Sequence, residues 1–350
     1  MLLKAPCLQP GDTVGLMSPS SPAAALYPHR LQQGVHSLRA MGLGVRLAPG
    51  INRRTRWTAG SPAERANDLH ELWADSEVKA IIATIGGDHA NQVLPFLDTA
   101  FMARQPKVLL GYSDVTVLLL ALHVRTNLVT FYGPAVLPEF GEPAGLMPYT
   151  FEYLHRAVFS VAPVGLIRPT TTWTDEFRDW DEARKKPRSR KLACNAGWRW
   201  LRPGRAKGQL LGGCLQSLMH LRGTQYWPNW NGALLFWEPS DSDSSPGHID
   251  SMLTDLDNSG VFAAISGMIV GRLCRYSEEQ RATLDEVILE RTSHLDFPIL
   301  VDVDFGHTDP KITLPIGVAA RLDSAADSFE IVQSGVIARA GAGKAVRELK

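Results

Sequence analysis

Three polar side chains that could form a catalytic triad each follow an apolar run typical of a buried β-strand. Ser113 follows VLLGY, Glu238 follows GALLFW and His307 follows PILVDVDFG. A hydroxyl, a carboxylate and an imidazole can act as the nucleophile, the orienting carboxylate and the general base of a serine hydrolase. The order Ser, Glu, His is one of those that such triads take. The three segments therefore predict nucleophilic acyl-transfer chemistry.

Each of these residues also has a simpler interpretation. Ser113 could be only the N-cap of the helix that begins at Asp114. Its segment is not the GxSxG elbow, because Val115 stands where the second glycine belongs. Glu238 could be a solvated strand end. In the hydrolase hypothesis Glu238 instead accepts the Nδ1–H of His307 and fixes the tautomer of that ring.

A second turn supports the hydrolase hypothesis. Gly86, Gly87 and Asp88 follow the apolar run KAIIATI, and paired glycines permit positive φ and close approach of the backbone to a ligand. An ordinary turn capped by Asp88 is the simpler alternative. If the two neighbouring strands are parallel, this turn and the Ser113 turn lie at the same carboxyl edge. Amides near Gly87 and Asp114 could then form an oxyanion hole.

The segment DVDFGHTDP leaves a metal site open as a minor alternative. Asp302, Asp304 and Asp309 accompany His307, and carboxylates with imidazole suit divalent metal ions. However, Asp302 and Asp304 share one face of a strand, and no second histidine is near. The favoured hypothesis therefore needs no metal and no organic cofactor.

The alternation of short strands and helical patterns predicts an α/β protein with two domains. The pattern predicts that residues 1–165 form a parallel-sheet, Rossmann-like domain that carries the nucleophile. It predicts that residues 208–350 form a mixed α/β domain with a β-rich, barrel-like core, and that this domain carries the glutamate and the histidine. Residues 166–207 are polar and rich in tryptophan, and they read as an excursion between the domains that shapes the substrate site.

The composition limits the partners. The chain has 350 residues with 36 Lys plus Arg and 36 Asp plus Glu, so nothing attracts the whole molecule to a nucleic-acid polymer or an anionic membrane. It contains no apolar run of membrane-spanning length and no signal-peptide pattern. The four cysteines are scattered without zinc-type spacing. These features predict a reduced, cytoplasmic protein and leave a small-molecule substrate open.

Five ordered segments resemble the LD-carboxypeptidase family of serine peptidases. They are IIATIGGDHANQVLPFLD, LLGYSDVT, GGCLQSL, LLFWEPSD and GHTDPKITLPIG. The resemblance implies that Ser113 is the nucleophile, His307 the general base and acid, and Glu238 its orienting carboxylate. It also implies that amides near Gly87 and Asp114 hold the oxyanion, and that the protein is a homodimer.

Two branches of that family are compatible with the sequence. One, the microcin C immunity branch, cuts the amide that joins a peptide or aminoacyl group to a modified nucleotide, which detoxifies the conjugate. The other is a muropeptide LD-carboxypeptidase that trims peptidoglycan stems. An alternative outside the serine hydrolases is a non-catalytic or metal-dependent nucleotide-binding protein. In the immunity branch a loop between the domains supplies an aromatic ring that stacks on the base, and the tryptophan-bearing excursion resembles that loop. The resemblance therefore favours the nucleotide branch.

Trp180 is the preferred stacking residue, with Trp173 and then Trp198 as further candidates. Trp198 and Trp200 read more readily as anchors of the excursion. Gly86, Asp88 and Cys214 complete the expected substrate-binding set. Cys214 departs from the family pattern, which has asparagine there, and a thiol is only a weak hydrogen-bond donor. This departure bears on the substrate more than on the chemistry.

Overall fold

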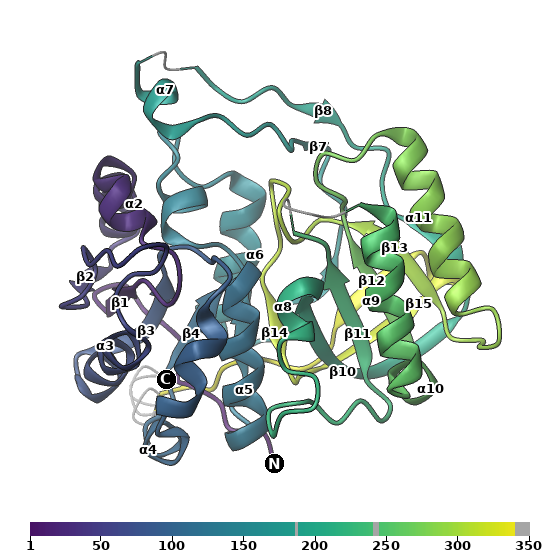
Figure 1. Cartoon of the computed structure of the whole chain (residues 1–350), viewed down its shortest axis with the longest axis horizontal. Coiled ribbons are helices and arrows are strands. Elements are labelled where there is room, and N and C mark those ends of the chain that lie inside the picture. The colour runs from purple at the N-terminus through teal and green to yellow at the C-terminus, as the bar shows by residue number, and fades with distance from the viewer. Residues whose placement is uncertain (186–187, 241–244, 340–350) are drawn as a thin grey trace, which may run out of the picture.

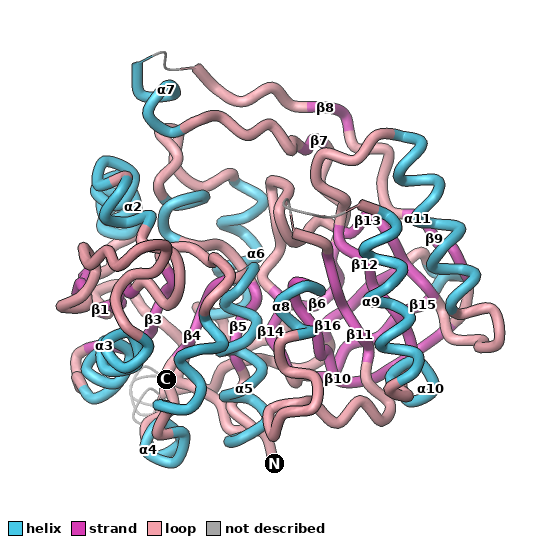
Figure 2. Tube along the Cα trace, viewed as in Figure 1, coloured by secondary structure: helices cyan, strands magenta, loops and turns pink. Residues whose placement is uncertain are grey.

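A parallel sheet forms the first half of the protein. The computed structural model describes residues 1–185, 188–240 and 245–339, and Figures 1 and 2 show its two large sheets with helices around them. The first sheet has the order β14-β5-β4-β3-β1-β2, in which only β14 runs antiparallel to its neighbour. The strands are β1 (Thr13–Met17), β2 (Gly44–Leu47), β3 (Val78–Ala83), β4 (Val108–Gly111), β5 (Thr130–Tyr132) and β14 (Leu314–Ile316).

The helices of this half follow the signals in the sequence. Ser61 and Glu64 form a capping box at the start of α3, and Pro62 is its first residue. The apolar helix α5 (Thr116–Thr126) is buried on nearly every side because it packs between β5 of the first sheet and β10 of the second. The other helices are α1 (Ala23–Leu26), α2 (Pro28–Ala40), α3 (Pro62–Ala74), α4 (Thr99–Arg104) and α6 (Pro148–Val158).

The second half forms a mixed sheet with the order β6-β16-β15-β10-β11-β12-β13-β9. Strands β10 to β13 are parallel, and the remaining pairs are antiparallel. The strands are β6 (Gly165–Ile167), β9 (Arg199–Arg202), β10 (Arg205–Cys214), β11 (Leu234–Glu238), β12 (Gly267–Gly271), β13 (Ile299–Val303), β15 (Ala319–Asp323) and β16 (Ser328–Ile331). The helices are α8 (Leu215–Met219), α9 (Pro246–Asn258), α10 (Val261–Ala264) and α11 (Glu278–Arg291).

The predicted α/β class, with a parallel N-terminal sheet and a mixed C-terminal sheet, is confirmed. The excursion carries its own small elements, β7 (Thr172–Trp173), α7 (Trp180–Lys185) and β8 (Ala193–Cys194), which run along the top of Figure 1 above both sheets. Its last strand, β9, belongs to the second sheet, whereas β14 from the second half completes the first. The domain boundaries at 165 and 207 stay a prediction, and residues 340–350 of the last predicted domain lie outside the described part.

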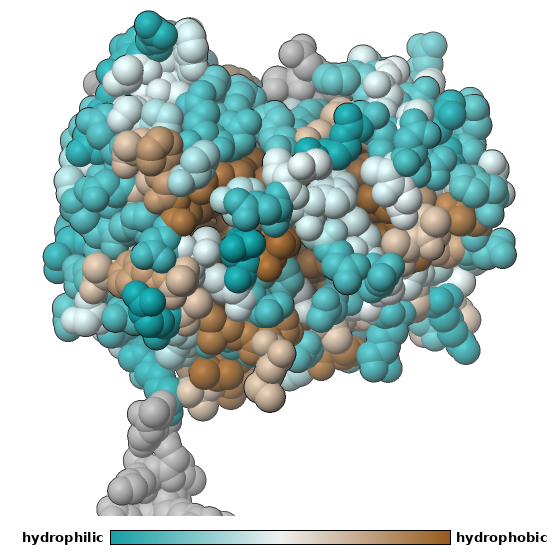
Figure 3. Space-filling model, turned by 60° about the horizontal axis from the view of Figure 1, so that its bottom comes forward, coloured by the Kyte–Doolittle hydropathy of each residue, from teal (hydrophilic) through white to brown (hydrophobic). Residues whose placement is uncertain are grey.

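The described helices include none that is both long and apolar enough to cross a membrane. The face in Figure 3 is mostly hydrophilic, with separate patches of hydrophobic residues between the polar ones.

Candidate active site

Ser113 lies on a strained turn between β4 and α5. It follows the end of β4 by two residues and has a φ of 61°, in the left-handed region that residues other than glycine rarely adopt. Such a conformation costs roughly 1–3 kcal/mol and persists where the surrounding structure enforces it. A tight strand-to-helix turn of this kind exposes the hydroxyl at the carboxyl edge of the sheet.

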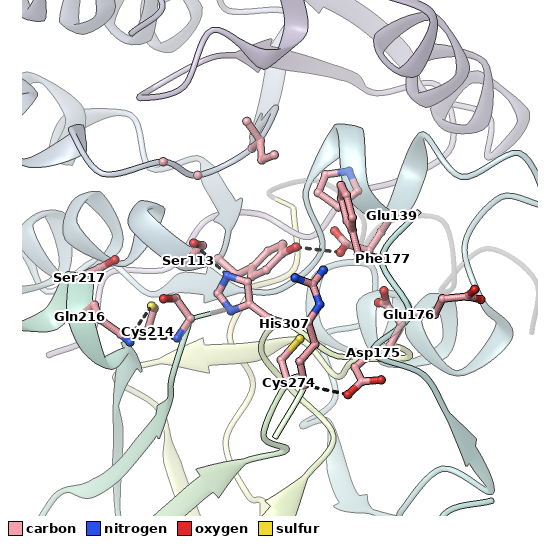
Figure 4. Close-up of a pocket in the computed structure, with 18 of the residues that line it drawn as sticks. Ser113, Glu139, Asp175, Glu176, Phe177, Cys214, Gln216, Ser217, Cys274 and His307 are labelled. Atoms are coloured by element: carbon pink, nitrogen blue, oxygen red, sulfur yellow. Dashed lines mark hydrogen bonds between the residues drawn. The ribbon is translucent and has the colours of Figure 1, made fainter. Parts of the chain in front are cut away.

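Ser113, His307 and Glu238 form one hydrogen-bonded row. His307 Nε2 lies 3.1 Å from Ser113 Oγ, and His307 Nδ1 lies 2.8 Å from Glu238 Oε2. Figure 4 shows Ser113 and His307 facing each other. Glu238 ends β11 and is fully buried, and the His307 side chain is 10% exposed. A carboxylate accepts hydrogen bonds, so Nδ1 carries the proton and Nε2 can accept the proton of Ser113.

Tyr132, at the end of β5, joins the row and was not singled out in the sequence. Its hydroxyl donates to Glu238 Oε1 at 2.5 Å and accepts the backbone N–H of Ser113 at 3.4 Å. Burial, reinforced by the charge of Glu238, raises the pKa of Tyr132 well above its usual range, so the hydroxyl stays a donor. A single tyrosine at the end of a strand carries no signal of this role in the sequence.

The glycine turn after β3 lies directly against the Ser113 turn. A Cβ built on Gly86 would fall 2.9 Å from Ser113 Oγ and 3.0 Å from the Asp114 nitrogen. Gly87 has a φ of +145°. The Asp114 carboxylate accepts the backbone N–H groups of His89 and Ala90, both at 2.8 Å, and so ties the two turns together. The amides of Gly87 and Asp114 therefore belong to adjoining turns.

Glycines also make room for Glu238. A Cβ on Gly271 would lie 2.7 Å from the Cβ of Glu238, and one on Gly306, whose φ is +96°, would lie 2.5 Å from its Cγ. Both positions need the absence of a side chain, because a Cβ that close would displace the buried carboxylate.

A cavity of about 330 Å³ opens above the row. Of the predicted residues it is lined by Ser113, His307, Gly86, Gly87, Asp88, Trp180 and Cys214. Cys214, at the end of β10, is buried next to Glu238 on β11. Burial and the charge of Glu238 raise the pKa of the Cys214 thiol well above its usual range. The Cys214 thiol is therefore uncharged where it lines the cavity.

Trp180 is held in place from outside the cavity. Its ring packs edge-on against Tyr27, with ring centroids 4.9 Å apart, and the Arg30 guanidinium lies 4.9 Å from its centroid. Both partners lie at the start of α2, so α7 is docked on the first half of the protein.

Trp173 lies apart from the other predicted substrate-binding residues, and its contact with substrate stays a prediction. Trp173 is not among the described residues that line the cavity; Arg272 and Arg281 lie over its ring at 4.9 and 5.3 Å. Trp198 donates to Asp304 at 2.8 Å and Trp200 to Asp327 at 2.9 Å, so both anchor the excursion. The packing of Arg272 and Arg281 on the ring accounts for the position of Trp173, since guanidinium groups stack well on indole.

The aspartates near His307 are engaged by arginines. Asp302 pairs with Arg199 at 2.7 Å, Asp304 with Arg272 at 2.9 Å and Asp309 with Arg190 at 2.8 Å. Within the described ranges no group of three or more His, Cys, Asp or Glu residues is placed to hold a metal ion. The donor set of the metal alternative is therefore not assembled there.

A buried ion-pair network, absent from the sequence predictions, forms one wall of the cavity. Lys311 pairs with Glu139 and with Asp309, the latter at 3.4 Å, and its Nζ lies 4.0 Å from the centroid of the Tyr112 ring. Burial lowers the pKa of Lys311, but the charges of Asp309 and Glu139 outweigh it and raise this pKa overall. The ring of Tyr112 in turn packs against His307, with centroids 5.2 Å apart.

Known proteins similar to this chain share both its sequence and its fold. Residues 14–133 match the model of the LD-carboxypeptidase N-terminal domain, and residues 207–322 match that of the C-terminal domain. The microcin C7 self-immunity protein MccF of Escherichia coli is 34% identical over 92% of this chain and 93% of its own. A "probable murein peptide carboxypeptidase" of Bacillus subtilis is 30% identical over 95% of both chains.

Solved structures give the same result. MccF in complex with aspartyl sulfamoyl adenosine superposes with a TM-score of 0.88 at 31% identity, covering 96% of this chain and all of MccF. An MccF-like protein of Streptococcus pneumoniae in complex with AMP has a TM-score of 0.81 at 26% identity, over 91% of this chain and 98% of its own. Matches of this length to both domain models, on a shared fold, show that the chain belongs to the LD-carboxypeptidase family.

Proposed function

We propose that the protein is a serine carboxypeptidase-like hydrolase in which Ser113, His307 and Glu238 form the catalytic triad. The observation that carries this proposal is the unbroken row of hydrogen bonds from Ser113 Oγ through the imidazole to a buried carboxylate. His307 Nε2 takes the hydroxyl proton as Oγ attacks the scissile carbonyl carbon. The carbon–nitrogen bond then breaks, and His307 gives the proton to the leaving nitrogen. Water hydrolyses the acyl-enzyme by the same steps.

The oxyanion of the tetrahedral intermediate is assigned to the amides of Gly87 and Asp114. The two turns that carry them adjoin, and Asp114 ties them together through its carboxylate. The Ser113 amide points instead to Tyr132. Donors fixed before the reaction stabilise the developing charge without reorganisation.

The proposed substrate is an amide between a peptide or aminoacyl group and a modified nucleotide. Trp180 lines the cavity and is braced by Tyr27 and Arg30, which suits a ring that stacks on a base. Stacking of this kind is worth roughly 1–3 kcal/mol per base. Similar proteins have been solved with aspartyl sulfamoyl adenosine and with AMP. In this proposal the enzyme detoxifies a microcin C-type conjugate.

A muropeptide LD-carboxypeptidase is the second candidate. It is favoured by the similarity along nearly the whole chain to a relative named as a murein peptide carboxypeptidase. Both candidates use the same triad, so they differ in the groups that bind on either side of the scissile amide.

The mechanism is tested by Ser113→Ala. Without the nucleophile, kcat should fall by about 10⁴-fold or more, whereas a chelator should leave wild-type activity unchanged. Full activity of the variant, or loss of activity with the chelator, would contradict the serine mechanism. Either result would instead favour a metal-dependent hydrolase, whereas a wild type that cleaves neither substrate would favour a merely nucleotide-binding role.

The substrate is tested by offering aspartyl sulfamoyl adenosine and an L,D-linked tetrapeptide to the purified protein. The proposal expects cleavage of the nucleotide conjugate, and Trp180→Ala should raise its KM by about 5- to 100-fold. Trp200→Ala, which removes an indole bonded to Asp327 outside the cavity, is the control. Cleavage of the tetrapeptide alone would establish the second candidate.

The homodimer and the cytoplasmic location stay predictions from the family resemblance and the composition. Light scattering coupled to size-exclusion chromatography would measure the mass of the protein in solution. A monomer at micromolar concentration would contradict the predicted dimer.

A further inference from the structure

Arg275 extends from the second half of the protein into the cavity that Ser113 and His307 line. It follows the end of β12 by four residues and has a φ of 58°, a conformation that an arginine adopts only under constraint. The constraint is Asp175 of the excursion, whose carboxylate accepts the Arg275 backbone N–H at 2.8 Å. Figure 4 shows Asp175 and Phe177 on the side of the cavity opposite Cys214 and Gln216.

Among the described residues, the guanidinium of Arg275 is oriented by an aromatic ring and has no ion-pair partner. It lies 5.2 Å from the centroid of the Phe177 ring, and no carboxylate in the described part of the chain forms an ion pair with it. Arg190, which lines the same cavity, differs because Asp309 and Glu142 both pair with it. Stacking on a ring leaves the N–H edge of a guanidinium available for another partner.

The excursion also holds Arg275 in a fixed relation to the histidine. Thr174 and Asp309 exchange two backbone hydrogen bonds, at 2.7 and 2.9 Å, two residues beyond His307. The Glu176 carboxylate accepts hydrogen bonds from the Arg188 side chain and from the Lys191 backbone amide. Asp175 sits between these two attachments, so the residue that constrains Arg275 is itself tied to the histidine loop.

We propose that Arg275 binds an anionic group on the leaving part of the substrate, next to the scissile amide. This inference rests on the proposed hydrolase function and deepens it. Both candidate substrates carry an anion there: a sulfamoyl or phosphoryl group in the nucleotide conjugate, and the terminal carboxylate in the tetrapeptide. The planar fork of a guanidinium matches either anion with two parallel hydrogen bonds.

The test compares Arg275→Met with Arg56→Met on charged and neutral substrates. Arg56 is a matched control because it is exposed, has a φ of 57° and lies over the Trp57 ring at 5.8 Å, away from the cavity lining. The charged substrates are aspartyl sulfamoyl adenosine and the L,D-tetrapeptide. The neutral ones are an aspartyl amide of aminodeoxyadenosine and the C-terminally amidated tetrapeptide.

Arg275→Met should lower kcat/KM about 10- to 100-fold for a charged substrate that the wild type cleaves. It should change the neutral analogue less than about 2-fold, and Arg56→Met should change neither. A loss confined to one charged substrate supports the inference and identifies its anion. An equal loss on charged and neutral substrates, or no loss on either, would overturn it.

If neither substrate is cleaved, the proposed function is refuted but the inference about Arg275 is not. Binding measurements then test the inference. By calorimetry the wild type should bind AMP more tightly than adenosine, and Arg275→Met should bind the two equally. An unchanged preference for AMP in the variant would show that Arg275 is not the anion site.

Discussion

Glu238 is buried between two hydrogen-bond donors, and this arrangement determines its chemistry. Tyr132 donates to one carboxylate oxygen and His307 to the other, so the group is satisfied as an acceptor although it is out of water. A buried carboxylate without such partners would be costly. In the proposed mechanism Tyr132 is therefore a positioning residue. It holds the Glu238 carboxylate and, through the hydrogen bond from the Ser113 amide, the turn that carries Ser113.

Tyr132→Phe should lower kcat by about 10-fold with little change in KM, because the hydroxyl touches the triad and not the substrate. It should also lower the free energy of unfolding by about 1–3 kcal/mol, the range for a hydrogen bond to a charged group. Tyr153→Phe is the control, since it removes a buried hydroxyl that accepts the Arg168 amide. Steady-state kinetics and urea unfolding measure both effects; an unchanged kcat would contradict the positioning role.

Cys214 should be a slow target for alkylation despite lining the cavity. Because its pKa is raised by burial and by Glu238, the reactive thiolate is scarce at neutral pH. In a Cys194→Ser background, which removes the exposed cysteine, inactivation by iodoacetamide should be slow at pH 7–8 and accelerate about tenfold per pH unit above that. Rapid inactivation at pH 7 that Cys214→Ser abolishes would show that the thiol ionises normally.

At the scale of elements, the site is built from the ends of parallel strands. β3 and β4 are neighbours, so the glycine turn that follows one meets the serine turn that follows the other. β11 and β13 end near them on the second sheet and bring the glutamate and the histidine. The excursion closes the cavity through α7 and through Asp175. Each element contributes one or two groups, and none forms a site by itself.

Gly86→Ala should reduce activity by at least about 100-fold while leaving the protein folded. The added methyl would meet Ser113 Oγ at 2.9 Å and must displace the nucleophile or its turn. Gly247→Ala adds the same methyl where nothing lies within 4 Å, and it should keep full activity. Comparing kcat and melting temperature for the two variants measures the effect. Wild-type kcat in Gly86→Ala would mean that the turns do not hold the reacting groups as tightly as the distances indicate.

At the scale of the whole molecule, the chain crosses between the two sheets more than once. β14 pairs with β5 of the first sheet, Ile337 pairs with Pro6, and α5 packs against strands of both sheets. Neither sheet can be completed by one half of the sequence alone. The proposed triad depends on both, because its serine comes from the first and its other members from the second.

The protein should therefore unfold in a single cooperative transition. Calorimetric and van't Hoff enthalpies should agree, and a ligand bound in the cavity should raise the melting temperature of the whole transition. Two resolved transitions, only one of which responds to ligand, would mean that the halves are thermodynamically separate.

Local patterns in the sequence predicted the α/β class, which is confirmed, and the residues of the proposed triad, whose roles stay a prediction. Each of those features depends on near neighbours in the chain: apolar alternation makes a strand, and turn residues end it. Ser113, Glu238 and His307 could be singled out because each follows such a strand. The resemblance to the LD-carboxypeptidase family added the order and spacing that none of them showed separately.

Contacts across the chain decided what the sequence could not. Nothing near Tyr132 indicates that it bonds Glu238, and nothing near Arg275 indicates that Asp175 directs it into the cavity. Trp173 and Trp180 look alike in the sequence, and both have an arginine over the ring in the structure. Only the cavity separates them, because Trp180 lines it and Trp173 is not among the described residues that do. The residue types of the proposed triad could thus be identified from the sequence, because strand ends are local features. Their convergence, their partners and the charge of the cavity were decided by tertiary packing, which joins residues far apart in the chain.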